Sequence, residues 1–141
     1  NSGLSLTVVT NMIDVMNVMS GDEFNKLIFI GGIFTEGHDG FVGASANREI
    51  SKYRFDKSFL GVVGVNAEKN SVSTYTFDDA ATKEIIVKSS KQAYMVLETR
   101  KLSKDGNFVY AAIDDFVGAI TEKPLEDWQK EKLSPYELEI I

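Results

Sequence analysis

Short apolar runs rich in β-branched residues alternate along this chain with segments whose apolar residues recur at helical spacing, and this alternation limits the fold more than any other feature. The first run, at residues 4–10 (LSLTVVT), passes directly into Met12, Val15 and Met16 at i, i+3 and i+4. A second run, at residues 26–30 (KLIFI), follows. Strand, helix and strand in this order predict one β-α-β unit with a right-handed crossover.

The alternation continues to the end of the chain. Strands that alternate with helices at this spacing predict an α/β fold in which helices on both faces flank a mostly parallel sheet. Asn11 is placed to cap the first helix, Gly21 to end it with a positive φ, and Thr76 with Asp79 to form a capping box. The later strands are expected at 58–65, 93–98, 108–113, 117–121 and 136–141, and the later helices near Ala46 to Tyr53, at 80–90 and from Pro124.

Charge and composition exclude several functions for these residues. The 21 acidic residues outnumber the 15 basic ones, so the chain lacks the excess of Lys and Arg that duplex DNA requires. Any DNA binding is therefore expected from another segment. The absence of cysteine fits a reducing cytoplasm, and no apolar run approaches the length that spans a membrane. At 141 residues, one domain is expected.

In a parallel sheet, ligands bind at the carboxyl ends of the strands. A glycine there serves as a turn residue or lets backbone N–H groups approach an anion, and both readings stay open. Lys101 follows a predicted strand, where its ammonium either pairs with a phosphate or is solvated. The positions that this rule selects are Asn11, Gly31, Gly32, Gly61, Gly64, Asn66 and Lys101.

No catalytic or metal-binding set emerges. Asp78 and Asp79 open a predicted helix, where acidic pairs usually oppose the helix dipole. His38 is the one histidine, which is too few for a His metal cluster, and neither GxGxxG nor GxxxxGK[ST] occurs. We therefore expect no catalytic residues, no metal and no cofactor.

An ordered set of motifs resembles the effector domain of the DeoR family of bacterial transcription repressors. The resemblance runs from Leu6 to about Thr121, and its most telling part is the segment Asp-Lys-x-Phe-Leu-Gly-x-x-Gly at 56–64. The motifs are LTVVTN (6–11), FIGG (29–32), FVG (41–43), FDKSFLGVVGVN (55–66), DDAATK (78–83) and ETRK (98–101).

The resemblance implies a fold related to ribose-5-phosphate isomerase, glucosamine-6-phosphate deaminase and the CoA-transferase-like proteins, and the binding of a phosphorylated sugar without turnover. Lys101 and backbone N–H groups would attract the phosphate. Asp79 and Lys83 would contact sugar hydroxyls or hold the shape of the pocket. The residues that would border the pocket are Asn11, Gly32, Gly64, Asp79 and Lys101.

The chain also departs from the family pattern. Asn66 stands where the family has Asp, Asp79 where it has Glu, and residues 98–100 read Glu-Thr-Arg in place of Asp-Ser-Ser. Residues 1–141 are expected to form a single effector-binding domain that lacks the family's first strand, its phosphate loop and its N-terminal winged helix-turn-helix. A missing strand would leave an exposed sheet edge.

Three functions remain in competition. The first is the sensor of a repressor that controls a carbohydrate-utilisation operon, acts as a dimer or tetramer, and meets operator DNA only through the absent N-terminal domain. The second is a sugar-phosphate isomerase or deaminase of the same fold. The third, a passive dimerisation module, predicts no stabilisation by any ligand. No membrane partner is expected.

Overall fold

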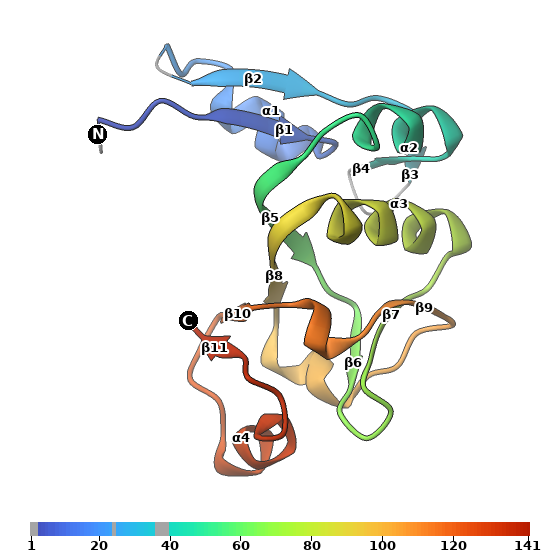
Figure 1. The fold of residues 1–141 in the computed structure, drawn as a ribbon, viewed down its shortest axis with the longest axis vertical. Helices are drawn as coiled ribbons and strands as arrows, with labels where there is room; N and C mark the ends of the chain where they lie inside the picture. The colour runs from blue at the N-terminus through green and yellow to red at the C-terminus, as the bar shows by residue number, and fades with distance from the viewer. Residues whose placement is uncertain (1–2, 24, 36–39) are drawn as a thin grey trace. The chain divides into compact units, whose positions relative to one another are not determined.

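A computed structural model describes residues 3–23, 25–35 and 40–141 (Figure 1). The chain divides into two compact units, Asn1–Lys52 and Tyr53–Ile141. The expectation of a single domain stays a prediction.

The first unit contains the predicted β-α-β arrangement. Strand β1 (Thr7–Thr10) pairs in parallel with β2 (Lys26–Phe29), and helix α1 (Ile13–Met19) connects them. An antiparallel pair, β3 (Ile33–Thr35) and β4 (Gly40–Val42), then leads into helix α2 (Ala44–Ile50), as the spacing of Ala46 and Ile50 predicts.

Both predicted ends of α1 are wrong. Met12 occupies the N-cap, and the Asn11 side-chain amide instead donates to the carbonyl oxygen of Phe41 at 2.8 Å. Gly21 does not take a positive φ; among described glycines only Gly3 and Gly43 do. Asn11 therefore joins the end of β1 to β4, a contact between segments distant in sequence that local spacing cannot reveal.

The second unit is built on a parallel sheet with the strand order β11-β10-β8-β5. One face carries Leu60, Met95 and Ala119, which are buried in the core of the unit. This mixed α/β architecture, with a four-stranded parallel sheet and flanking helices, confirms the predicted fold class. The strands are β5 (Phe55–Gly61), β8 (Ser90–Leu97), β10 (Gly118–Thr121) and β11 (Glu139–Ile140).

A second, antiparallel sheet of this unit differs from the prediction. The apolar run at 58–65 forms two strands, because β5 ends at Gly61 and β6 (Gly64–Asn66) begins a hairpin with β7 (Ser71–Thr74). Strand β9 (Phe108–Ala111) pairs with the other side of β7. Strand β7 is not predicted, because its Ser-Val-Ser-Thr sequence lacks the apolar content expected of a buried strand.

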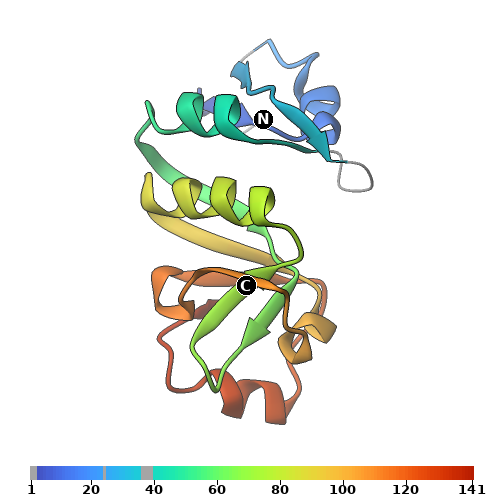
Figure 2. The same ribbon diagram turned by 90° about the vertical axis from the view of Figure 1, so that its right-hand side faces the viewer.

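Helix α3 (Phe77–Lys88) packs against both sheets, and the β6–β7 hairpin points away from it (Figure 2). The Thr76 hydroxyl caps α3 by accepting from the Asp79 backbone N–H, which is one half of the predicted capping box. The Asp79 carboxylate does not complete the box and instead accepts from the Thr74 hydroxyl. The remaining helices are the 3₁₀ turns η1 (Thr99–Ser103) and η2 (Ile113–Asp115) and helix α4 (Asp127–Leu133). A helix near Pro124 is predicted and present, but α4 begins three residues later than the predicted start. It ends two residues before Pro135, which cannot continue a helix.

Candidate functional site

Asp79, Lys83 and Gly61 lie together where strand β5 ends. The Lys83 ammonium donates to the Gly61 carbonyl oxygen at 2.8 Å and lies 3.0 Å from Oδ2 of Asp79. The Thr74 hydroxyl donates to the same Asp79 oxygen at 2.6 Å. The Lys83 and Asp79 side chains are only 17% and 27% exposed. Two predicted residues of α3 therefore meet a third at the carboxyl end of the parallel sheet.

Tyr110 of β9 is the residue of this cluster that the sequence analysis missed. The Lys83 ammonium lies 5.7 Å from the centroid of the Tyr110 ring. Tyr110 is 6% exposed, and its hydroxyl has no hydrogen-bond partner among the described residues. Burial raises the pKa of this hydroxyl, and the charge of Asp79 raises it further. A tyrosine inside an apolar strand gives no sequence signal that separates it from the core.

Lys101 lies in η1, directly after β8, as predicted. Its ammonium is 3.6 Å from Oε1 of Glu98, whose Oε2 accepts a 2.7 Å hydrogen bond from Nε of Arg100. The Arg100 hydrogen bond and charge, with a contribution from Lys101, hold the pKa of Glu98 below its ordinary value. Lys101 is thus placed beyond the carboxyl end of β8. Its ammonium is paired with the Glu98 carboxylate, which an anionic ligand would have to replace.

Glu122, just after β10, fixes the position of η1. Its carboxylate accepts from the Thr99 backbone N–H at 2.9 Å and from the Thr99 hydroxyl at 2.9 Å. Burial alone would raise the pKa of Glu122, but the hydrogen bonds from Thr99 and from the Glu122 backbone, together with the charge of Lys123, outweigh it and lower the pKa. The side-chain amide of Gln129 donates to the Thr99 carbonyl oxygen. These hydrogen bonds therefore hold η1, the 3₁₀ turn that carries Lys101, in a fixed position.

Asn66 serves the structure of the β6–β7 hairpin. Its Oδ1 accepts from the backbone N–H groups of Glu68 and Lys69, and its Nδ2 donates to Oδ2 of Asp105 at 3.1 Å. The Ser73 hydroxyl donates to Oδ1 of the same Asp105. These hydrogen bonds, that from Asn66 first, lower the pKa of Asp105. The Asn66 side chain is thus engaged in holding the turn and the loop before β9.

The four predicted glycines fall into two kinds. A methyl group at Gly64 would lie 2.8 Å from the Lys104 carbonyl oxygen, and one at Gly32 would lie 2.6 Å from that of Val42. These two glycines are needed for close backbone packing. At Gly31 and Gly61 a methyl group would meet nothing within 4 Å. Only these two leave backbone open for the approach of a ligand.

The predicted ligand-binding residues are divided between the two units. Asn11, Gly31 and Gly32 belong to the first unit, and the remaining residues to the second. His38 lies outside the described residues. Among residues 3–23, 25–35 and 40–141, no group of three His, Asp or Glu side chains is arranged to hold a metal ion.

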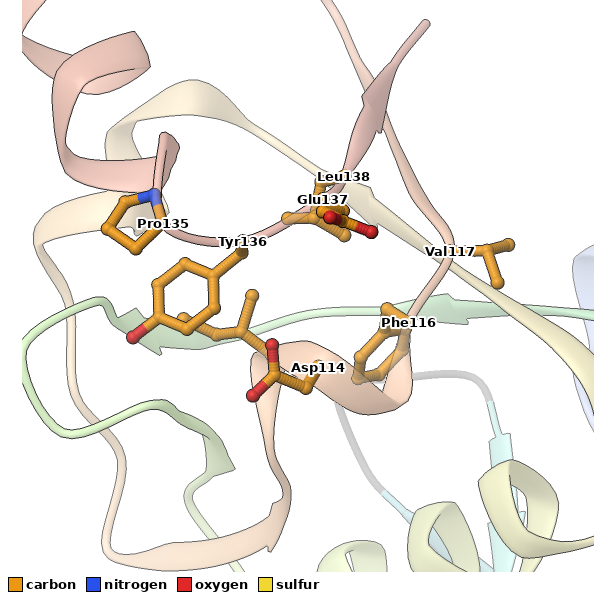
Figure 3. A pocket seen from close by; sticks show the side chains of 8 residues that line it. Asp114, Phe116, Val117, Pro135, Tyr136, Glu137 and Leu138 are labelled. Atoms are coloured by element: carbon orange, nitrogen blue, oxygen red, sulfur yellow. The ribbon is translucent and has the colours of Figure 1, made fainter.

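A separate hollow of about 400 Å³ opens between η2 and the segment that precedes β11 (Figure 3). Tyr136 reaches across this region and donates its hydroxyl hydrogen to the Ala67 carbonyl oxygen. None of the predicted residues lines the hollow, so it is a different place from the Asp79–Lys83 cluster. Its lining residues are Ile113, Asp114, Phe116, Val117, Pro135, Tyr136, Glu137 and Leu138.

Comparison with known proteins decides the family. The family model of the DeoR C-terminal sensor domain matches residues 1–123. The chain belongs to this family. The resemblance drawn from the sequence motifs is thereby confirmed. Within the described part of the chain, no helix is long and apolar enough to cross a membrane.

Curated relatives of this DeoR-family chain are named as repressors. It is 25% identical over 122 residues to the HTH-type transcriptional repressor GlcR of Bacillus subtilis, covering 86% of this chain and 46% of the relative. It is 25% identical to the lactose phosphotransferase system repressor of Staphylococcus aureus and 27% identical to that of Staphylococcus epidermidis, covering 97% of this chain and 54% of each relative. The chain therefore spans about half the length of these relatives.

Proposed function

We propose that this chain is the sugar-phosphate-sensing domain of a DeoR-type transcriptional repressor of a carbohydrate-utilisation operon. The observation that carries the proposal is the Asp79–Lys83 pair fixed to Gly61 at the carboxyl end of β5, in a chain of the DeoR sensor family. Ligands of α/β folds bind at this end of the sheet. The names of the relatives, two of which are lactose phosphotransferase system repressors, support a carbohydrate effector.

The charges of the site suggest which residues bind the sugar of the ligand and which bind its phosphate. The Asp79 carboxylate would repel a phosphate group and accepts hydrogen bonds from sugar hydroxyls, while Lys83 donates to sugar oxygens. Lys101 offers an ammonium near the adjacent strand end, and Gly61 leaves backbone accessible. In this proposal Asp79 and Lys83 hold the sugar and Lys101 attracts the phosphate. Gly64 and Asn66 act by shaping the backbone of the second unit.

In this proposal, DNA binding itself belongs to a segment outside these 141 residues, and this chain controls it. The net charge of −6 supports that division. Strand β5 pairs with β8, and no described strand pairs with its other side. Taken by itself, the second unit therefore has a sheet edge that could pair with a strand from elsewhere, and a dimer or tetramer in the cytoplasm is part of the proposal.

The regulatory claim is tested on a longer protein that joins this domain to its DNA-binding segment. Fluorescence anisotropy would follow its binding to the DNA upstream of its own operon, at one fixed salt concentration. We expect one sugar phosphate to change the DNA affinity by about 5–150-fold, the usual size of a coupling between two sites. An affinity that no sugar phosphate changes would contradict the proposal.

The names of the relatives favour a regulator over the isomerase or deaminase of related fold. The same sugar phosphate should therefore remain unchanged when it is incubated with the protein. Phosphorus NMR spectra of the mixture would show this over several hours. New phosphate resonances that require the protein would establish the enzyme function instead.

A further inference from the structure

We propose that Tyr110 is a further ligand-contacting residue of this domain, and that its hydroxyl binds an oxygen of the sugar beside Asp79 and Lys83. The inference rests on the proposed function and deepens it. It assigns the Asp79–Lys83–Tyr110 cluster to the hydroxyl-bearing part of the effector and not to its phosphate.

The first observation is the unsatisfied Tyr110 hydroxyl. Buried polar groups in folded proteins nearly always find a hydrogen-bond partner, because leaving one without a partner costs stability. Among the described residues, only Tyr110 and Ser58 bury a side-chain oxygen without a partner. A phenylalanine would fill the space of Tyr110 without that cost. The hydroxyl is thus unfavourable in the protein alone, and a ligand oxygen would remove the penalty.

The second observation is the unused hydrogen-bonding capacity of the Lys83 ammonium, which lies over the Tyr110 ring. The Lys83 ammonium has three donors, and the described contacts use two of them, on Gly61 and Asp79. The ammonium, with its third hydrogen, lies 5.7 Å from the centroid of the Tyr110 ring that bears the hydroxyl. Two donors and the Asp79 carboxylate together match a polyol, which offers an acceptor oxygen next to a donating hydroxyl.

The charges separate this subsite from a phosphate site. Asp79 lies close enough to raise the pKa of Tyr110 through its charge, so a phosphate beside Tyr110 would face a carboxylate. A neutral hydroxyl or carbonyl oxygen meets no such repulsion. The Lys83 ammonium lies over the Tyr110 ring. As part of the proposal, movement of this flexible side chain on ligand binding exposes the hydroxyl.

The variant Tyr110→Phe tests the inference, with Ser58→Ala as the matched control. Both changes remove a buried hydroxyl that has no partner, so both variants should melt at or above the wild-type temperature. Ser58 lies inside β5, three residues before Gly61, and is not part of the cluster. Affinity would be measured by calorimetric titration with hexose 6-phosphates and ketohexose 1-phosphates, in this chain and in the longer repressor.

For the sugar phosphate that binds the wild-type protein, we expect Tyr110→Phe to weaken affinity about fivefold to tenfold, as the loss of one hydrogen bond does. Ser58→Ala should leave the affinity unchanged. Binding of inorganic phosphate, measured by competition, should be the same in Tyr110→Phe and in the wild type.

Three results would overturn the inference while leaving the sensor proposal intact. They are an unchanged affinity of Tyr110→Phe, an equal loss of affinity for inorganic phosphate, and a loss of affinity accompanied by a lower melting temperature. A wild-type protein that binds no sugar phosphate in either form would overturn the sensor proposal itself, and the Tyr110 assignment with it.

Discussion

Thr99 gives both its backbone N–H and its hydroxyl hydrogen to the carboxylate of Glu122, each at 2.9 Å. Thr99 follows β8 and Glu122 follows β10, so these bonds join the carboxyl ends of two neighbouring parallel strands. Lys101 stands two residues beyond Thr99, in the same 3₁₀ turn. The pair therefore determines where the ammonium of Lys101 is presented.

Replacing Glu122 by alanine should loosen this turn without removing any residue proposed to touch the ligand. The amide hydrogens of Thr99 and Lys101, bonded to Glu122 and to the Glu98 carbonyl oxygen, should exchange faster with solvent. Hydrogen exchange followed by mass spectrometry would measure this. Glu84→Ala, which removes an exposed carboxylate of α3, is the control. Unchanged exchange in Glu122→Ala would show that the turn is held by other contacts.

Lys83 should contribute more to stability than a similar lysine of the same helix. Lys83→Met removes the donor to Gly61 and leaves Asp79 without its cation, so we expect a loss of about 1–2 kcal/mol in the free energy of unfolding. Lys88 also pairs with a carboxylate four residues earlier, but its side chain is 72% exposed. Lys88→Met should cost less than about 0.5 kcal/mol. Urea denaturation would measure both, and equal losses would contradict the role given to Lys83.

Two glycines at adjacent strand ends should respond oppositely to alanine. A methyl group at Gly64 would lie within 3.0 Å of Lys104, Ser73 and Asp105 atoms, so Gly64→Ala should lower the free energy of unfolding by about 1–3 kcal/mol. Gly61→Ala meets open space and should leave stability nearly unchanged. A reduced sugar-phosphate affinity in Gly61→Ala would then report approach of the ligand to the backbone. Thermal unfolding that ranks the two variants in reverse would refute this packing argument.

Acid should weaken the link between the β6–β7 hairpin and the loop before β9. The hydrogen bonds from Asn66 and Ser73 lower the pKa of Asp105 in the folded state. Its stabilising contribution is therefore complete above the unfolded pKa of about 3.9 and is lost as pH falls through the lower folded pKa. Asp105→Asn should be less stable than the wild type at neutral pH, and the difference should shrink on acidification. A difference that stays constant down to the acid range would argue against this contribution.

The sequence predicted the α/β order because apolar periodicity distinguishes strands such as β2 and β8 from helices such as α2 and α3. It could not predict β7, since three of its four residues, Ser71, Ser73 and Thr74, are small and polar and yet buried. The partners of Ser73, Asp105 and Gly106, lie far along the chain. The end of β5 at Gly61 was also hidden, because the apolar run continues through Val62 and Val63.

Part of the candidate site was also predictable, but from motifs and strand-end positions and not from apolar periodicity. Asp79, Lys83 and Gly61 were selected by motif and by position at a strand end, and the structure brings them together. Tyr110 could not be predicted, because its significance depends on an unpartnered hydroxyl that only three-dimensional contacts reveal. Asn66 and Gly64 stand at a strand end as well, yet their contacts there are with the hairpin and the Lys104–Asp105 backbone.

The most direct test of the sensor claim is the melting temperature of the chain in the presence of phosphorylated sugars. A ligand that binds only the folded state stabilises it by about 2.7 kcal/mol at one hundred times its dissociation constant. We predict that one sugar phosphate raises the melting temperature of this chain, or of a longer chain extended upstream, while the unphosphorylated sugar does not. No rise in either chain with any phosphorylated sugar would contradict the account.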